Sequence, residues 1–246
     1  MSIDDRKSSH LYGLATLGLS VALGLFFVSG ALRDIRRGNE EVTVTGSARR
    51  AIRSDFAVWK ITVSVQSPSL VTASQELARG TERVRAFLKA EGVPDSQLTV
   101  KPVEAAGVSE TTQDGRETGK IIATRASQSF EVRSRDVDAI TRTSQRAATL
   151  LAEGVPLQAP APEYSYTKLG EIRLALLEEA TKDARQRADA IAKSSGASVG
   201  AVRDARMGVF QITPRFSTEI SDYGVNDVTS IEKDVTAVIR ATFQLR

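Results

Sequence analysis

An uncharged apolar run is the strongest feature of the hydrophobic pattern. It covers residues 11–32, is rich in Leu and Gly, and has 22 residues. As a helix rising about 1.5 Å per residue it would be roughly 33 Å long, against a bilayer hydrocarbon core of about 30 Å. The pattern therefore predicts one transmembrane helix at 11–32, after a short tail at 1–10 and before a linker at 33–40. Residues 41–246 contain no comparable run and are expected to be a water-soluble domain, although their length would also allow two small domains.

Two features bear on how the predicted span is processed and oriented. Small residues at 29–31 offer a position where a signal peptidase could cut, but the apolar region of a cleaved signal usually has only about 7 to 15 residues, so we expect a retained anchor. Counting the flanking basic residues weakly favours the carboxyl side remaining inside, yet long domains often cross regardless of charge, so charge leaves the orientation open. These basic residues are Arg6, Lys7, Arg33, Arg36 and Arg37.

Alternating apolar and polar positions predict several strands in the soluble part. The segment 56–66 alternates strictly, which is typical of a half-buried strand and places Trp59 in the core; the alternative for Trp59 is an aromatic platform for a ligand. A shorter strand at 41–48 ends in a glycine turn. Further strands are expected at 98–104, 120–133, 198–213 and 235–245, with a polar loop at 107–119.

Three helices are predicted, each followed by a return to a strand. The first two, at 69–91 and from 135 to about 152, both end in the sequence Glu-Gly-Val-Pro, which indicates a repeated unit. The third, at 170–195, has small or apolar residues at every fourth position, and such a narrow face can approach a sheet closely. These positions are Leu176, Ala180, Ala184, Ala188 and Ala192.

An irregular stretch at 214–230 precedes the last strand. Connections of this length in compact domains are often functional or interfacial. Three aromatic residues lie in or beside it, namely Phe210, Phe216 and Tyr223. They are the candidate interface residues, and they could equally line a groove for a ligand or peptide.

Charge and composition exclude several classes of function. The chain has a formal net charge of +3, but residues 39–246 hold 28 basic and 27 acidic residues, interspersed, so we expect no nucleic-acid partner. The chain has no cysteine, and His10 at the edge of the span is its one histidine, which argues against thiol chemistry, a Ser-His-Asp triad or a multi-histidine zinc site. No catalytic, cofactor-binding or metal-binding residue is assigned. Glu104, Glu110 and Asp114 could serve a carboxylate-dependent hydrolase, but their spacing fits a solvated loop as well.

Three segments resemble the SIMPL-domain (YggE-like) family. They are VTVTGSARRAIRSDFAVWKITVSV at 42–65, EEATKDARQRADAIAKSSGASVGAV at 178–202 and DVTAVIRATFQL at 234–245. The second is the most specific, because an alanine-rich helix followed by Gly-x-x-x-Gly and a strand recurs in that family. Ser47 and Ala48 replace a turn that is often glycine-rich there.

The resemblance implies an α/β (α+β) domain of repeated strand-helix-strand units, with mixed sheets and packed helices. It also implies a bacterial protein exported to the periplasm or attached to the inner membrane, a homo-oligomeric ring or cage, and an association with oxidative-stress tolerance. No catalytic residue is carried over from it.

The expected function is therefore a non-enzymatic, single-pass inner-membrane scaffold with its soluble domain in the periplasm and with itself and the lipid bilayer as partners. Small residues of the span are expected to assist assembly, because small side chains let helices approach closely in lipid. They are Thr16, Ser20 and Gly24 on one face, with Gly18 and Ala22 adjoining. The alternatives are a periplasmic ligand- or peptide-binding module that uses the 210–224 region and, less favoured, the carboxylate hydrolase.

Overall fold

The computed structural model describes residues 40–246, and these form an α/β protein as predicted. The predicted tail, the span at 11–32 with its five contact residues, and most of the linker lie outside the described residues. No helix within 40–246 combines the length and hydrophobicity needed to cross a bilayer. The described chain divides into two compact units. Three of the boundaries between them fall inside β1, α5 and β10, and the fourth falls between β8 and β9.

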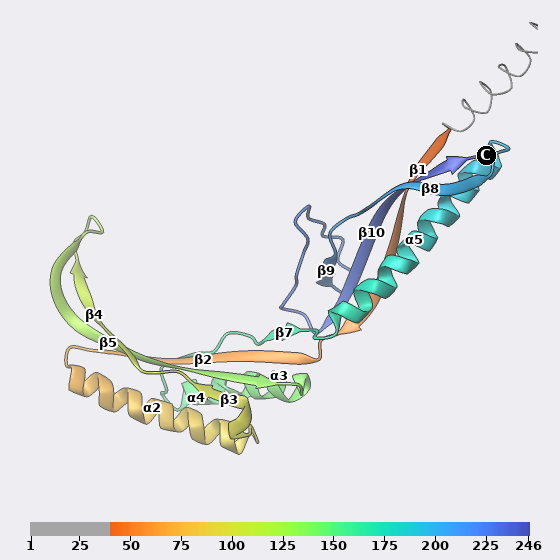
Figure 1. The fold of residues 1–246 in the computed structure, drawn as a ribbon. Helices are drawn as coiled ribbons and strands as arrows, with labels where there is room; N and C mark the ends of the chain where they lie inside the picture. The colour runs from red at the N-terminus through yellow and green to blue at the C-terminus, as the bar shows by residue number, and fades with distance from the viewer. Residues whose placement is uncertain (1–39) are drawn as a thin grey trace, which may run out of the picture. The chain divides into compact units, whose positions relative to one another are not determined.

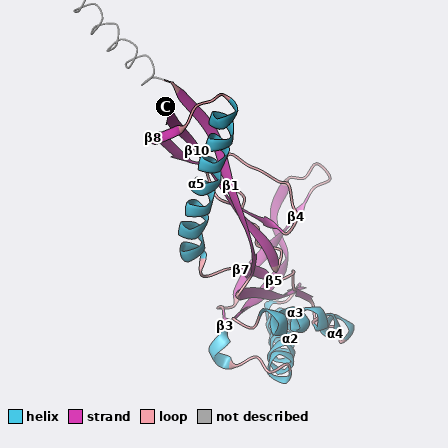
Figure 2. Ribbon diagram, turned by 90° about the vertical axis from the view of Figure 1, so that its right-hand side faces the viewer, coloured by secondary structure: helices cyan, strands magenta, loops and turns pink. Residues whose placement is uncertain are grey.

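The first unit comprises residues 40–48, 174–209 and 237–246. Its sheet has the order β1-β10-β8, built from β1 (Glu41–Arg53), β10 (Glu232–Leu245) and β8 (Val199–Met207). One face is covered by α5 (Leu169–Ser194), which runs along the strands (Figures 1 and 2). The predicted small-residue stripe of α5 is confirmed as its buried face, since Leu176 and the four alanines are at most 1% exposed.

Gly46 of β1 explains why that stripe must be small. A Cβ atom added at Gly46 would lie 2.2 Å from the carbonyl oxygen of Ala180 and 2.4 Å from the amide nitrogen of Ala184. The two backbones therefore meet without any side chain between them. Asp183, the residue before Ala184, accepts a hydrogen bond from the amide of Ser47 at 2.8 Å, and this bond joins the strand to the helix.

The second unit comprises residues 49–173 and 210–236. Its main sheet has the order β3-β5-β2-β6, with β4 paired to β5 and β7 paired to β2. The two long central strands are β2 (Phe56–Ser67) and β5 (Glu117–Ser134). The shorter strands are β3 (Leu98–Val100), β4 (Glu104–Thr111), β6 (Leu157–Gln158), β7 (Glu163–Ser165) and, paired with the start of β10, β9 (Gln211–Pro214).

Helices cover one face of the β2–β5 sheet (Figure 1). They are α2 (Leu70–Ala90), α3 (Val137–Arg146) and α4 (Ala148–Ala152), and a short 3-10 helix, η1 (Asp95–Gln97), precedes β3. Trp59 is fully buried beneath them and donates its indole N–H to the carbonyl of Pro160 at 3.0 Å. Trp59 is thus a core residue, and the interpretation as a ligand platform is wrong.

Five sequence-based expectations need correction. The strand expected at 41–48 does not end in a glycine turn but continues through Gly46 to residue 53, and the single strand expected at 198–213 is two strands, β8 and β9. The sheets are not mixed, because the strand pairings of the described chain run antiparallel. The pair β1–β10 follows the same rule, since Leu245 donates its N–H to Glu40 and Thr43 pairs with Thr242. The expected polar loop at 107–119 is a β-hairpin arm formed by β4 and β5, and the single helix expected after residue 134 is broken at Ala147.

Candidate functional site

The connection between β9 and β10 carries the largest exposed apolar side chains of the second unit. We call residues 215–230 the aromatic loop. Its side chains of Phe216, Ile220 and Tyr223 are 82%, 81% and 98% exposed, respectively. An aromatic or branched aliphatic side chain left this open loses the free energy that burial would give it, so its position needs a structural explanation.

Phe216 is held in a backbone conformation that a bulky residue rarely adopts. Its φ is +64°, in the left-handed region, where it is the single non-glycine residue among those described. Such a conformation costs about 1 to 3 kcal/mol and persists only where the surroundings enforce it. The buried carboxylate of Asp234 accepts the Phe216 amide at 3.2 Å, and the Arg215 guanidinium lies 5.1 Å from the centre of the phenyl ring. The backbone of Phe216 is thus held by Asp234, while its side chain is exposed.

A buried glutamine fixes the far part of the loop. Gln211 of β9 donates from Nε2 to the carbonyl of Ser221 at 2.7 Å and accepts the amide of Val225 at its Oε1 at 2.8 Å. These two bonds bracket Tyr223. Because Gln211 is only 7% exposed, the clamp is shielded from competing water.

The buried Lys233 contacts the end of the aromatic loop near Asp227. This lysine of β10 is 1% exposed, and its ammonium donates to the carbonyls of Tyr164, at 2.8 Å, and Asp227, and lies 3.8 Å from the Asp227 carboxylate. Burial lowers the pKa of Lys233, against the opposing effect of Asp227. Burial disfavours ionisation of Asp227, but hydrogen bonds from Thr229 and Ser230 and the charge of Lys233 outweigh it and lower its pKa.

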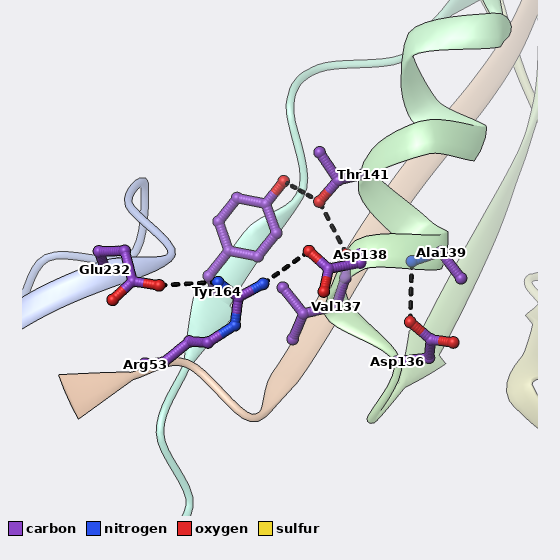
Figure 3. A network of polar contacts seen from close by, with 8 residues as sticks. All are labelled: Arg53, Asp136, Val137, Asp138, Ala139, Thr141, Tyr164 and Glu232. Carbon is purple, nitrogen blue, oxygen red and sulfur yellow. Dashed lines mark hydrogen bonds and ion pairs between the residues drawn. The ribbon is translucent and has the colours of Figure 1, made fainter.

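Arg53 links the foot of the loop to α3 (Figure 3). Its guanidinium donates to Glu232 at 2.7 Å and to Asp138 at 2.6 Å, and the hydrogen bond to Glu232 is the main cause of its raised pKa. Beside it, the hydroxyl groups of Tyr164 and Thr141 are 2.9 Å apart. The foot of the loop therefore lies beside two sets of polar contacts, while its large apolar side chains are exposed.

The predicted interface residues are only partly brought together. Phe216 and Tyr223 share the aromatic loop, whereas Phe210 precedes β9, is half-buried, and has the Arg173 guanidinium 5.5 Å from its ring centre. Ile220 was not predicted, since a single isoleucine in a polar stretch gives no pattern. Lys233 was not singled out either, although it is in phase with the inward positions Val235 and Ala237, which was a readable signal.

The three carboxylates of the hydrolase hypothesis lie apart along the β4–β5 arm. Glu110 lies six positions beyond Glu104 on the same strand, which corresponds to roughly 20 Å. Glu110 lies 3.8 Å from Lys120, and Asp114 lies at the hairpin turn with Gly115. Within residues 40–246, no three acidic, histidine or cysteine side chains gather in a way that would hold a metal ion. The structure thus keeps Glu104 and Glu110 apart, and the described part of the arm gathers no such metal-binding group.

Comparison with known families agrees with the resemblance noted in the sequence. Residues 42–243 match the SIMPL family, described as a protein of unknown function (DUF541). The chain belongs to the SIMPL family. This match covers strands and helices of both units. No curated protein matches the chain.

Proposed function

We propose that this SIMPL protein is a non-enzymatic, membrane-anchored scaffold that assembles with copies of itself through the aromatic loop. The observation that carries the proposal is that Phe216, Ile220 and Tyr223 are exposed on a loop whose backbone is hydrogen-bonded to the buried side chains of Asp234 and Gln211. Aromatic anchors that are ordered before binding are typical of the residues that dominate binding energy at protein interfaces.

Exposure also favours this function over the binding module. A side chain that is 98% exposed, as Tyr223 is, cannot help to enclose a ligand within one protomer. It can be covered by a second protein surface, and burying a large apolar side chain contributes about 1.5 to 3 kcal/mol. The strain at Phe216 points the same way, because backbone strain tends to persist at functional positions.

The membrane anchor and the periplasmic location are part of the proposal and rest on the apolar run at 11–32 and the family resemblance. The connection to oxidative stress would be indirect. A chain with no cysteine and two methionines has no thiol with which to remove oxidants.

The test compares the mass of the detergent-extracted full-length chain with that of a double variant, Phe216→Asn with Tyr223→Ser. Asparagine tolerates the left-handed conformation at 216, so the loop keeps its backbone. We expect the wild type to run as an oligomer and the double variant to have a lower mass. Val71→Ser, at a 65% exposed apolar residue of α2, is the matched control and should leave the mass unchanged. A monomeric wild type, or an unchanged double variant, would contradict the proposal.

A further inference from the structure

Among residues 40–246, strand β8 lies at the edge of the sheet in the first unit and pairs with no strand on its outer side. It lies at the end of the order β1-β10-β8, and its residues from Ala201 to Met207 are exposed. Two of them are large and apolar, since Val202 is 49% and Met207 is 56% exposed. An open edge with apolar side chains is a template for adding another strand.

An apolar groove runs beside this edge, between β8 and α5. It has a volume of about 660 Å³, and Leu174, Leu177, Val202 and Phe243 are among its lining residues. Arg185 of α5 fixes the groove, because its guanidinium donates to the carbonyls of Val199 and Gly200 at 2.8 Å each and lies 5.4 Å from the ring centre of Phe243. Leu174, at 73% exposed, remains uncovered on its rim.

The charged residues of β8 are arranged so that two antiparallel copies of this strand could place opposite charges next to each other. Asp204 and Arg206 are paired to Thr242 and Arg240 of β10, so both side chains point away from α5, where they are 55% and 80% exposed and form an ion pair at 3.1 Å. An antiparallel pair of β8 strands centred on Ala205 sets Asp204 of each copy opposite Arg206 of the other. Pairs centred on Asp204 or on Arg206 would oppose like charges, which is unfavourable.

We infer that β8 pairs with β8 of a second copy, with Ala205 on the twofold axis. The β1-β10-β8 sheets of the two copies then join into one continuous sheet, with both α5 helices on the same face and the apolar groove of each copy adjoining the other. This inference rests on the proposed function, because the partner is again a second copy of this chain. It adds the β8 edge to the aromatic loop as a second surface for self-association. A single self-complementary surface stops at a dimer, so two such surfaces are needed for a larger assembly.

The first test uses the absence of cysteine from the chain. In the inferred pair, Ala205 faces its own counterpart with Cβ atoms about 5 Å apart, within reach of a disulfide or a short bis-maleimide. The full-length Ala205→Cys variant should therefore cross-link to a covalent dimer. Ala201→Cys is the matched control on the same strand, since its counterpart would lie about 25 Å away. Equal cross-linking of the two variants would overturn the inference.

The second test separates contacts between copies from the ion pair within one chain. Asp204→Arg and Arg206→Asp each oppose like charges across the axis, and each should weaken the dimer on the order of ten-fold or more. Mixing the two variants should restore it, because each then faces its complement. Glu82→Arg, a matched reversal of an exposed charge on α2, should have no effect. Failure of the mixture to recover would overturn the inference.

The tests of the aromatic loop and of the β8 edge can give different outcomes. If the Phe216→Asn, Tyr223→Ser variant still yields the Ala205→Cys dimer at a reduced total mass, both surfaces are supported. A full cross-link with no effect of the loop variant supports β8 and contradicts the aromatic loop. The reverse pattern retains the proposed function and removes the β8 pair.

Discussion

At Gly46 the strand β1 and the helix α5 are in backbone contact, and no side chain larger than hydrogen fits between them. Periodicity predicted the alanine face of the helix correctly. It could not predict which strand that face meets, because the contact joins residues more than 130 positions apart. A methyl group added at Gly46 would overlap the backbone of α5 at Ala180 and Ala184.

Gly46→Ala should lower the free energy of unfolding by about 1 to 3 kcal/mol, because the new Cβ atom overlaps backbone atoms that cannot rotate away. Gly170→Ala, in α5 itself, is the control. A Cβ atom there meets open space, and alanine favours helix by up to about 1 kcal/mol, so this change should be neutral or stabilising. Thermal melts of both variants provide the comparison, and equal midpoints would mean that β1 and α5 separate readily.

Asp183 should make stability depend on pH. Its pKa is lowered mainly by the hydrogen bond from the Ser47 amide and then by Arg187, against the effect of burial. The folded protein therefore releases this proton more readily than the unfolded chain, whose aspartate has a pKa of about 3.9. The stabilisation is complete above about pH 4 and is lost as the pH falls through the lower, folded-state pKa.

Urea unfolding of the wild type and of Asp183→Asn across this pH range tests that dependence. The stability difference between the two proteins should be largest well above about pH 4 and should shrink under more acidic conditions. A difference that stays constant with pH would show that the charge of Asp183 does not contribute.

At the scale of the element, the aromatic loop depends on its buried lysine. Lys233→Met removes the donor to the carbonyls of Tyr164 and Asp227 and leaves the Asp227 carboxylate without its counter-charge. Breaking a buried pair in this way costs about 3 to 5 kcal/mol. We expect a lower melting temperature and faster chymotrypsin cleavage beside Phe216 and Tyr223. Lys60→Met, at an exposed lysine 3.5 Å from Glu163, should change neither.

The prediction of an element succeeded best where one face is buried and its ends are marked by local residues. The first helix was predicted at 69–91 and lies at 70–90, because its apolar side and the glycine that follows it are both encoded locally. The β4–β5 arm has few buried residues on either face, so its sequence lacks the alternation that marks a strand. No glycine or proline marks the break between α3 and α4 at Ala147. The helical spacing of apolar residues also continues across this break to Leu150, so the sequence predicts one helix.

At the scale of the whole molecule, the family could be predicted but the pairing of its strands could not. Strand direction depends on which segments meet, and no local pattern encodes that. The candidate site shows the same division. Aromatic residues in a long loop are visible in a sequence, whereas the left-handed φ of Phe216 and the clamp made by Gln211 appear only in three dimensions.

The proposed topology places residues 41–246 outside the inner membrane. Protease added to intact spheroplasts should therefore digest the soluble domain, because the membrane does not protect it. Inverted vesicles are the control and should protect the domain. Survival in spheroplasts together with digestion in inverted vesicles would reverse the orientation.

The two ends of the described chain lie next to each other. The amide of Leu245 donates to the carbonyl of Glu40 at 2.8 Å, so the last strand finishes where the first begins (Figure 1). With the predicted anchor ending at residue 32, eight residues of linker reach at most about 29 Å. A fluorescent protein fused after Arg246 would then be crowded against the lipid surface. A small dye at that position would instead report the distance to the headgroups.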